Sequence, residues 1–348
     1  MKSEKKFLNH IHYFRGFAII NIVMAHVWRL PPEFRNQPGA QLIPPLREVV
    51  FHDSTIYFLF VSGFLLQYLA PRIKAKKYYK SKLFFVVFPF LFMSLSITFL
   101  RFFISKGHGE VSLLSFLTQA MEPIALGNAQ VQYWYIPFIV PIFLISPFLL
   151  KIPKSIFNKV CFLVCFFPIL GTRTGTQIGI GQYIYFLPIY LLGMRAAMDY
   201  PEFLSYIKHR FYYLFVVFSM TSVVLLLIYT GFLEIPYCRG IVNVKESLFY
   251  FQKISFCFMA LIFWEKLDNK SIPIMKNLAE YSFGIYFTHT LLFGRIDNLF
   301  YGQVVAHFPR FLLPMSIVLA MMTLLVSLLF CIASKNIFGK KSRLLIGA

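Results

Sequence analysis

Residues 211–230 read FYYLFVVFSMTSVVLLLIYT, a stretch of the chain without a single charged side chain. A helix of this length crosses the hydrocarbon core of a bilayer, which requires roughly 20 mostly apolar residues. The rest of the 348-residue chain is similar, because 58% of it is hydrophobic, only 14% is charged and its mean hydropathy is +0.67. An ordinary soluble domain is about 25% charged. The composition excludes a soluble enzyme, a disordered protein and a coiled coil, and it predicts an all-α, polytopic integral membrane protein.

The chain contains ten apolar segments, this stretch among them, which predict about ten transmembrane helices. Together they form a single membrane domain, residues 1–348. The fifth segment is short and contains Pro168, and the ninth is polar for a span. The first follows a lysine-rich start but lacks a small-x-small cleavage site, so we interpret it as a retained span rather than a signal peptide. The segments are 7–28, 52–70, 83–104, 132–150, 159–171, 182–198, 211–230, 247–265, 281–300 and 311–333.

The net charge of +20 has an explanation in membrane topology. Of the 34 Lys and Arg residues, 21 fall on alternate flanks of the ten segments and eight on the opposite flanks. Cytoplasmic loops accumulate Lys and Arg, so the split predicts that both termini are cytoplasmic and favours topology over nucleic-acid binding. The rich flanks include the basic loop 72–82 and the basic tail 334–348, whereas 29–50 and 105–131 are predicted outer loops.

The loops and cysteines carry little recognisable chemistry. The outer loop 29–50 is rich in proline, and the loop 105–131 contains an amphipathic stretch, Leu113 to Leu126, that is expected to lie along the membrane surface. Four of the five cysteines lie in predicted spans, and no pair has metal-site spacing. The sequence therefore predicts neither a metal site nor a disulfide.

Ionisable residues within the first span are the strongest functional candidates, because charges inside a membrane are costly. At about 100° per residue, the eleven residues from Arg15 to His26 make three full turns plus about 20°, so both side chains lie on one face of the helix. They are about 16 Å apart along its axis. His12 lies within about 60° of this face, and Gly16 allows a neighbouring helix to approach closely. The alternative is that Arg15 snorkels to the headgroups while His26 only caps the outer end.

The ninth span repeats this pattern. Ser282 and His289 are seven residues apart and share one face, with Tyr286 close to it, so both spans are expected to line one cavity. Ser62 and Gly63 in the second span fit either a cavity wall or a packing notch. Trp134, at the start of the fourth span, fits either the cavity or an aromatic belt at the interface.

Elimination narrows the chemistry. The chain has no P-loop, dinucleotide fingerprint, metal-ligand pair or nucleophile elbow, and its spans are poor in acidic residues. The scarcity of carboxylates argues against a proton pump and against a glycosidase. What remains is histidine acid–base chemistry beside fixed positive charge. This combination suits attack of a hydroxyl on an activated acyl group, with histidine taking the proton and arginine holding a phosphate or an oxyanion.

In these motifs the chain resembles the acyltransferase-3 family of polytopic membrane O-acyltransferases, which includes the O-antigen and capsule O-acetyltransferases. The resemblance covers nearly the whole chain. It rests on Arg15-Gly16 with His26, on Phe60-Val61-Ser62-Gly63-Phe64 before a basic loop, on Trp134, and on Ser282-Phe283-Gly284-Ile285-Tyr286 with His289. It implies transfer of an acyl group, usually acetyl from acetyl-CoA, to a hydroxyl of an extracytoplasmic or lipid-linked sugar. It also implies that Arg15 and His26 form the central functional pair.

The chain departs from the family pattern at one point. Family members often carry a pair of arginines just before the proline of the third span, where this chain has Val86 ahead of Pro89. Lysines stand nearby, but an ammonium is a point charge and not a bidentate fork, so the grip on the CoA phosphates must differ. No hydrolase-like domain follows the tenth span, which predicts the stand-alone form of the family.

These observations lead to a specific hypothesis. The nucleotide end of acyl-CoA docks on the basic loop at Lys77, Lys80 and Lys82, and the thioester arm passes Arg15. His26 is the general base for the acceptor hydroxyl. The remaining cavity-lining candidates orient the substrate or stabilise charge: His12, Ser62, Trp134, Ser282, Tyr286 and His289.

We expect a location in the cell inner or plasma membrane, no bound cofactor, the bilayer and a glycan or lipid-linked sugar as partners, and no nucleic-acid partner. Two rival hypotheses remain open at the level of the sequence. One is a transporter or flippase for a polysaccharide intermediate, and the other is a non-catalytic component of a glycan-synthesis complex.

Overall fold

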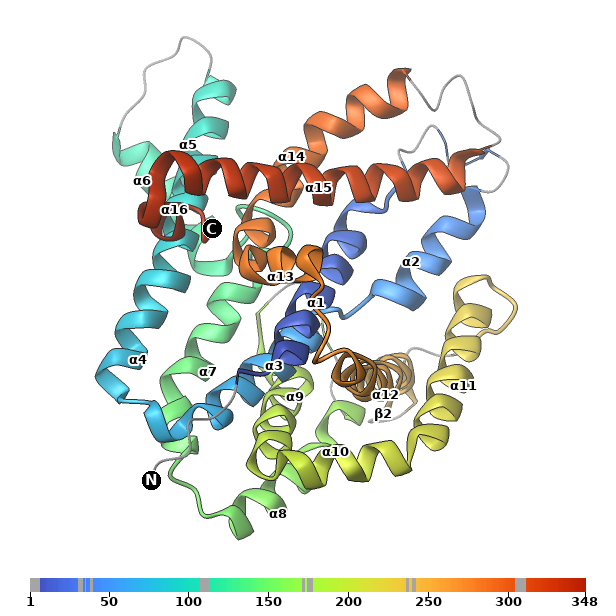
Figure 1. The fold of residues 1–348 in the computed structure, drawn as a ribbon. Helices are drawn as coiled ribbons and strands as arrows, with labels where there is room; N and C mark the ends of the chain where they lie inside the picture. The colour runs from blue at the N-terminus through green and yellow to red at the C-terminus, as the bar shows by residue number, and fades with distance from the viewer. Residues whose placement is uncertain are drawn as a thin grey trace.

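The computed structural model describes residues 7–30, 34, 36–37, 40–106, 113–170, 173, 178–235, 238–239, 242–303 and 311–348. Within these ranges the chain is almost entirely helical (Figure 1), which confirms the all-α prediction. The exception is a short hairpin of two strands with two residues each, in which β1 (Cys238–Arg239) pairs antiparallel with β2 (Val242–Asn243). Lys2, Lys5, Lys6 and parts of both predicted outer loops lie outside the described residues.

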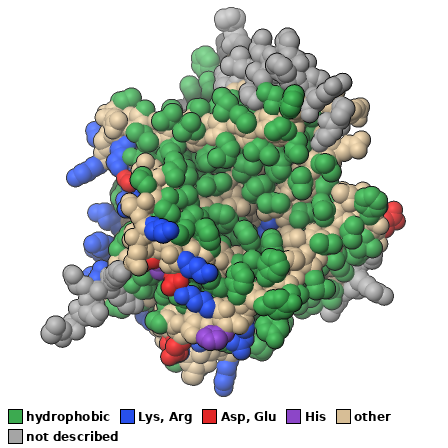
Figure 2. Space-filling model, turned by 45° about the vertical axis from the view of Figure 1, so that its right-hand side comes forward, with side chains coloured by type: hydrophobic (Ala, Val, Ile, Leu, Met, Phe, Trp, Pro, Cys, Tyr) green, Lys and Arg blue, Asp and Glu red, His purple; other side chains and the backbone are tan. Residues whose placement is uncertain are grey.

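Five of the described helical stretches are long and apolar enough to cross a membrane: Ala40–Tyr68, Ala75–Ile104, Phe211–Tyr229, Val244–Lys266 and Leu312–Leu345. Many of their large apolar side chains point outward, and Figure 2 shows them as a broad hydrophobic face with Lys and Arg gathered towards one side. An exposed apolar surface of this extent is typical of contact with lipid. The chain is therefore a multi-pass membrane protein, whereas the count of ten spans and the cytoplasmic termini stay predictions.

Helix α1 (Asn9–Val27) lies near the centre of the molecule (Figure 1). It packs against α3 (Thr55–Tyr68), α12 (Val244–Lys266), α13 (Pro273–Glu280) and α14 (Ser282–Gln303). Twelve of its residues are buried, including both Gly16 and Asn21. A helix that is apolar nearly all round belongs in such a core, and this position fixes the side chains of α1 against several partners at once.

The tightest helix pair joins α3 to α9 (Ile180–Met198) through two glycines. A Cβ atom at Gly63 would lie 2.0 Å from the carbonyl oxygen of Tyr190, and one at Gly193 would lie 2.1 Å from that of Phe60. Neither position can hold a side chain without moving a backbone. The structure thus confirms Gly63 as a packing notch, which was one of the two interpretations of this motif.

Several predicted loops contain helices. The basic segment 72–82 forms α4 (Ala75–Lys82), which passes through a π-helical turn, Leu83–Val87, into α5 (Phe88–Lys106). Alanine and lysine are good helix formers, so this segment extends the helix of the third apolar segment instead of ending it. The outer loop 29–50 contains α2 (Ile43–Phe51), and Leu113–Leu126 forms α6, as its amphipathic pattern indicated.

The fifth apolar segment is not a continuous helix over 159–171. Helix α8 (Lys154–Val164) begins earlier and ends before Pro168, which sits in a 3-10 turn, Phe167–Ile169. Proline lacks the backbone N–H that a helix interior needs, which explains the break. The remaining helices are α7 (Tyr135–Leu149), α10 (Tyr200–His209), α11 (Phe211–Tyr229), α15 (Leu312–Phe338) and α16 (Ser342–Leu345).

Candidate functional site

The polar faces of α1 and α14 meet at two points. Near one end, Nη2 of Arg15 donates hydrogen bonds to the carbonyl oxygen of Ala279 (3.0 Å) and to Oγ of Ser282 (2.9 Å). Near the other end, the rings of His26 and His289 lie with their centroids 5.6 Å apart. Arg15 is thus half-buried and tied to α13 and the start of α14. The two helices run in the same direction here.

His289 has one ring nitrogen engaged and one free. Its side chain is fully buried, and Nδ1 lies 2.9 Å from the carbonyl oxygen of Ile285. A carbonyl only accepts, so Nδ1 carries the proton and Nε2 of the neutral ring is an acceptor. Among the described residues Nε2 has no hydrogen-bond partner. A buried nitrogen with an open lone pair beside a second histidine is unusual, because buried polar atoms are nearly always paired.

His26 lies where two cavities meet. A small cavity of about 20 Å³, with room for little more than one water molecule, and a larger, open one of about 390 Å³ share the lining residues Ile22, His26, Thr55 and Trp134. The smaller cavity is otherwise walled by aromatic and amide side chains: Phe58, Gln132, Tyr135, Phe283 and Tyr286. Trp134 therefore lines the cavities as well as standing at the start of α7.

The wall of the smaller cavity is held by hydrogen bonds between α14 and the segment before α7. The hydroxyl of Tyr286 donates to the carbonyl oxygen of Gln132 (2.5 Å), and that of Tyr133 donates to the carbonyl oxygen of Phe287 (2.9 Å). The amide of Gln132 in turn donates to Oγ1 of Thr290 (2.8 Å). These bonds surround His289 on its own helix, so its ring is held in one position relative to His26.

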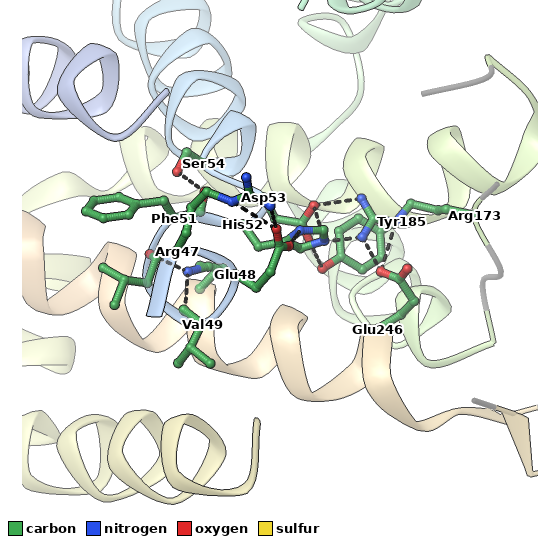
Figure 3. A network of polar contacts seen from close by, with 12 residues as sticks. Arg47, Glu48, Val49, Phe51, His52, Asp53, Ser54, Arg173, Tyr185 and Glu246 are labelled. Atoms are coloured by element: carbon green, nitrogen blue, oxygen red, sulfur yellow. Dashed lines mark hydrogen bonds and ion pairs between the residues drawn. The ribbon is translucent and has the colours of Figure 1, made fainter. Parts of the chain in front are cut away.

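A network of polar side chains that the sequence did not reveal lies along the larger cavity (Figure 3). We call it the outer polar network, and its members are Arg47, Glu48, His52, Asp53, Arg173, Tyr185, Glu246 and Lys253. Its centre is the guanidinium of Arg173, which makes two parallel bonds to the Asp53 carboxylate (2.8 and 2.9 Å) and bonds to Glu246 through Nε (2.9 Å). All three side chains are at least nine-tenths buried. Burial opposes the charged form of Arg173, but Asp53 and Glu246 outweigh it and hold the pKa of Arg173 above its ordinary value.

Asp53 occupies a special backbone position. It is the one non-glycine residue with positive φ among the described residues (φ 57°), and it forms the bend between α2 and α3. Aspartate tolerates this left-handed conformation better than most residues. The bend points its carboxylate at Arg173 and at the hydroxyl of Tyr185 (2.7 Å), while Nε2 of His52 lies 3.5 Å away.

The rest of the outer polar network surrounds the end of α2. Glu48 bonds to His52 through Nδ1 (3.0 Å) and to Nε of Arg47 (3.1 Å). Lys253 is buried on α12, and its ammonium donates to the carbonyl oxygens of Val49 (3.1 Å) and Val50 (2.7 Å). The last carbonyls of a helix lack intrahelical partners, so Lys253 satisfies groups that would otherwise be left open. The cavity wall is thus charged, close to neutral overall, and firmly held.

The basic residues predicted to bind a donor lie on α4. Lys77 and Lys80 are exposed on α4, whereas Lys82 turns inward, with its ammonium 4.0 Å from the ring centroid of Phe143. The positive charge of Arg15 acts on Lys82. His12 contacts the ring of Phe7, and Ser62 lies within hydrogen-bonding reach of Tyr135. The structure therefore separates the predicted residues into a group around Arg15 and a group around His26.

His10 shows what a purely structural histidine looks like in this fold. Its Nδ1 pairs with Asp268 (2.8 Å) and its Nε2 with the hydroxyl of Tyr200 (2.6 Å), and it lines neither of the two cavities described above. Both nitrogens are occupied, so the group anchors the start of α1 to its neighbours. No group of three or more His, Cys, Asp or Glu side chains suited to a metal occurs in the described part of the chain.

The outer polar network could not be predicted from the sequence, because its members come from distant segments. A signal was nevertheless present: the chain has only 14 acidic residues, and Glu48, Asp53 and Glu246 all stand at the ends of apolar segments. Acidic residues at such positions are costly without partners, which marks them for attention.

Comparison with known proteins gives one match. A family model described as an acyltransferase domain, that of the acyltransferase-3 family, matches residues 8–334. Neither the curated proteins nor the solved structures contain a match.

Proposed function

Since the chain belongs to the acyltransferase-3 family, we propose that this multi-pass membrane acyltransferase moves an acyl group, most simply acetyl, from a cytoplasmic acyl-CoA to a hydroxyl of a cell-envelope polysaccharide or glycolipid. The observation that carries the proposal is the position of His26 at the junction of two cavities of different character. The wide polar cavity suits a hydroxyl-rich acceptor, and the small aromatic cavity beside it offers an apolar end for the acyl group.

In this proposal His26 is the general base. One imidazole nitrogen takes the proton of the acceptor hydroxyl as its oxygen attacks the thioester carbonyl. The tetrahedral intermediate then collapses, the carbon–sulfur bond breaks, and the proton passes from His26 to the leaving thiolate of CoA. An ester and a free thiol result, and the base is regenerated. The open Nε2 of His289, close to the His26 ring, supports a role in orienting His26 or in stabilising its cationic form.

The acceptor is expected to occupy the larger cavity. Carboxylates and guanidinium groups of the outer polar network offer acceptors and donors for sugar hydroxyls, and Trp134 offers a flat apolar surface for the ring. The donor is expected near Arg15 and Lys82, and where Lys77 and Lys80 are exposed on α4. Acyl-CoA is then a co-substrate, and no bound cofactor enters the reaction. The inner or plasma membrane is the proposed location, with the bilayer and a glycan as partners.

The test is an assay of the purified protein in lipid nanodiscs with radiolabelled acetyl-CoA and an extracted envelope glycan. We expect transfer of label to the glycan in the wild type and a loss of it in His26→Ala, with unchanged membrane insertion. Mass spectrometry of surface glycans from cells with and without the protein should show a mass difference of one acyl group. Glycan translocation without any consumption of acetyl-CoA would instead identify a transporter or flippase.

A further inference from the structure

We propose that Arg343, in the C-terminal helix α16, is a binding residue for the phosphates of the acyl-CoA donor, together with Arg15 and Lys82. The proposal rests on the proposed function for the identity of the donor. The carrying observation is geometric: the tail that holds Arg343 packs between the π-helical turn that follows Lys82 and the start of α14, where Arg15 bonds to Ser282. Three cations, from the start, the third apolar segment and the end of the chain, therefore converge.

The segment 339–348 is packed back onto the membrane helices. Helix α16 lies beside α5 and the π-helical turn (Figure 1). The hydroxyl of Ser342 lies within hydrogen-bonding distance of the carbonyl oxygens of Gly339 (2.8 Å) and Ala348 (2.7 Å). Gly347 has φ +76° and fits against the ring of Phe283, where a Cβ would lie only 3.0 Å from Cδ1. The tail is thus held in a defined place.

This packing sets the guanidinium of Arg343 over the ring of Phe85, with Cζ 4.2 Å from the centroid. Stacking on an aromatic face orients the guanidinium and leaves its N–H groups open for an anion. Phe85 belongs to the π-helical turn that begins directly after Lys82. Two cations therefore lie at this turn: Lys82 directly precedes it, and Arg343 stacks on Phe85 within it.

The segments that carry the three cations pack against one another or against the same neighbours. Gly347 packs against Phe283, the residue after the Ser282 that Arg15 bonds, and Arg343 stacks on Phe85, three residues after Lys82. None of the three takes part in an ion pair among the described residues, in contrast to Arg173, which bonds two carboxylates. Like charges gathered in a partly buried place repel one another, and an anion bound between them relieves that repulsion.

The chemistry that fits is a phosphate or diphosphate. Guanidinium groups bind phosphate oxygens in a bidentate fashion, and an ammonium adds a point charge. Val86 leaves the π-helical turn without an arginine of its own, and Arg343 supplies a guanidinium to that same turn from elsewhere in the chain. Arg343 is exposed and meets the nucleotide end, while Arg15 is more deeply placed on the way to His26. A lipid headgroup in the same leaflet presents the same phosphate chemistry.

The experiment measures CoA binding and acyl transfer in parallel with Arg343→Ala, Arg343→Lys and the matched control Lys340→Ala, an exposed cation of the same segment. In zwitterionic nanodiscs, we expect Arg343→Ala to weaken binding of CoA about tenfold, Arg343→Lys to weaken it less, and Lys340→Ala to leave it unchanged. In the transfer assay the KM for acetyl-CoA should rise while kcat changes little. The ratio of kcat/KM for acetyl-CoA to that for S-acetyl-N-acetylcysteamine, which lacks phosphates, should fall about tenfold.

Three results separate the possibilities. Equal CoA affinity in Arg343→Ala and the wild type overturns the proposal. Loss of binding to phosphatidylglycerol with unchanged binding of CoA also overturns it and assigns the cations to a lipid headgroup. Arg343-dependent binding of CoA without any transfer to a glycan supports this site while it rejects the proposed function. If Arg343→Ala fails to fold, Phe85→Leu removes the stacking surface and should weaken CoA binding in the same direction.

Discussion

The imidazole rings of His26 on α1 and His289 on α14 lie 5.6 Å apart between centroids, and Nδ1 of His289 is tied to the backbone of its own helix. The pair joins two helices that are separated by most of the chain. It also places an open acceptor nitrogen beside the proposed base, so substitution of each histidine should affect the reaction differently.

We expect His26→Ala to lower kcat about 10²–10⁴-fold, because general acid–base catalysis typically contributes that much. His289→Gln should lower kcat less, since the amide keeps a hydrogen-bonding group near His26 but no titratable nitrogen. Rates of acetyl transfer by both variants, reconstituted at equal amounts, test the difference. The control is His10→Gln, which should alter the stability of the protein and not the pH dependence of kcat. A His26→Ala enzyme with wild-type turnover would remove the general-base role.

Arg15→Lys should behave as a poor replacement. A lysine side chain is shorter and ends in a tetrahedral ammonium, so it does not reproduce the planar Nη2 group that bonds to both Ala279 and Ser282. We expect a several-fold higher KM for acetyl-CoA and a lower kcat/KM, measured with the same acceptor at saturation. Ser282→Ala is the companion variant, because it removes one partner and keeps the charge. A pattern in which Ser282→Ala is impaired and Arg15→Lys is normal would contradict this account.

Asp53→Asn should destabilise the protein strongly. The substitution leaves the buried guanidinium of Arg173 with Glu246 as its remaining carboxylate, and removal of one partner of a buried ion pair typically costs about 3–5 kcal/mol. Chemical denaturation in detergent measures the change. In the double variant Asp53→Asn/Arg173→Gln the loss should be smaller than the sum of the single losses, since Arg173→Gln alone leaves two buried carboxylates without the guanidinium, whereas the double variant leaves only Glu246 without it.

The matched control for this experiment is the exposed ion pair of Lys154 and Asp199 (2.7 Å). Asp199→Asn should change stability by no more than about 1 kcal/mol. The hydrogen bond from Lys154 lowers the pKa of Asp199, so the small stabilisation is present above the ordinary pKa of an aspartate. It is lost as the pH falls through the lowered value. A loss of stability in Asp199→Asn as large as that in Asp53→Asn would contradict the expectation that the buried ion pair contributes more than the exposed one.

Gly63→Ala should disrupt the pairing of α3 and α9. The new methyl group would stand 2.0 Å from a backbone oxygen, so the helices must separate, and the cost should exceed the 1–3 kcal/mol that is roughly typical of an overpacked core. Thermal unfolding and the yield of folded protein report the change. Gly294→Ala on α14 is the control, because nothing lies within 4 Å of its position, and it should be neutral or slightly stabilising.

The sequence by itself determined the class of the protein and one side of its site. Composition and uninterrupted apolar segments establish an all-α membrane protein, because no other structure satisfies the backbone of such segments in lipid. The helical repeat also places Arg15 with His26, and Ser282 with His289, since residues on one helix keep fixed angular positions whatever surrounds them. The structure pairs these two faces with each other, as their shared polar character indicated.

Only the tertiary structure decided the rest of the site. Asp53 and Arg173 are 120 positions apart, and Arg173 and Glu246 are 73 apart, so no local pattern links them. The tail after Arg343 and the first helix meet at the start of α14, where Gly347 packs against Phe283 and Arg15 bonds to Ser282. Periodicity encodes which face of a helix is polar, but the partner of that face depends on how all helices pack, and on close contacts such as those of Gly63 and Gly193. The pairing of charges across the cavity is a property of that packing and not of any single segment.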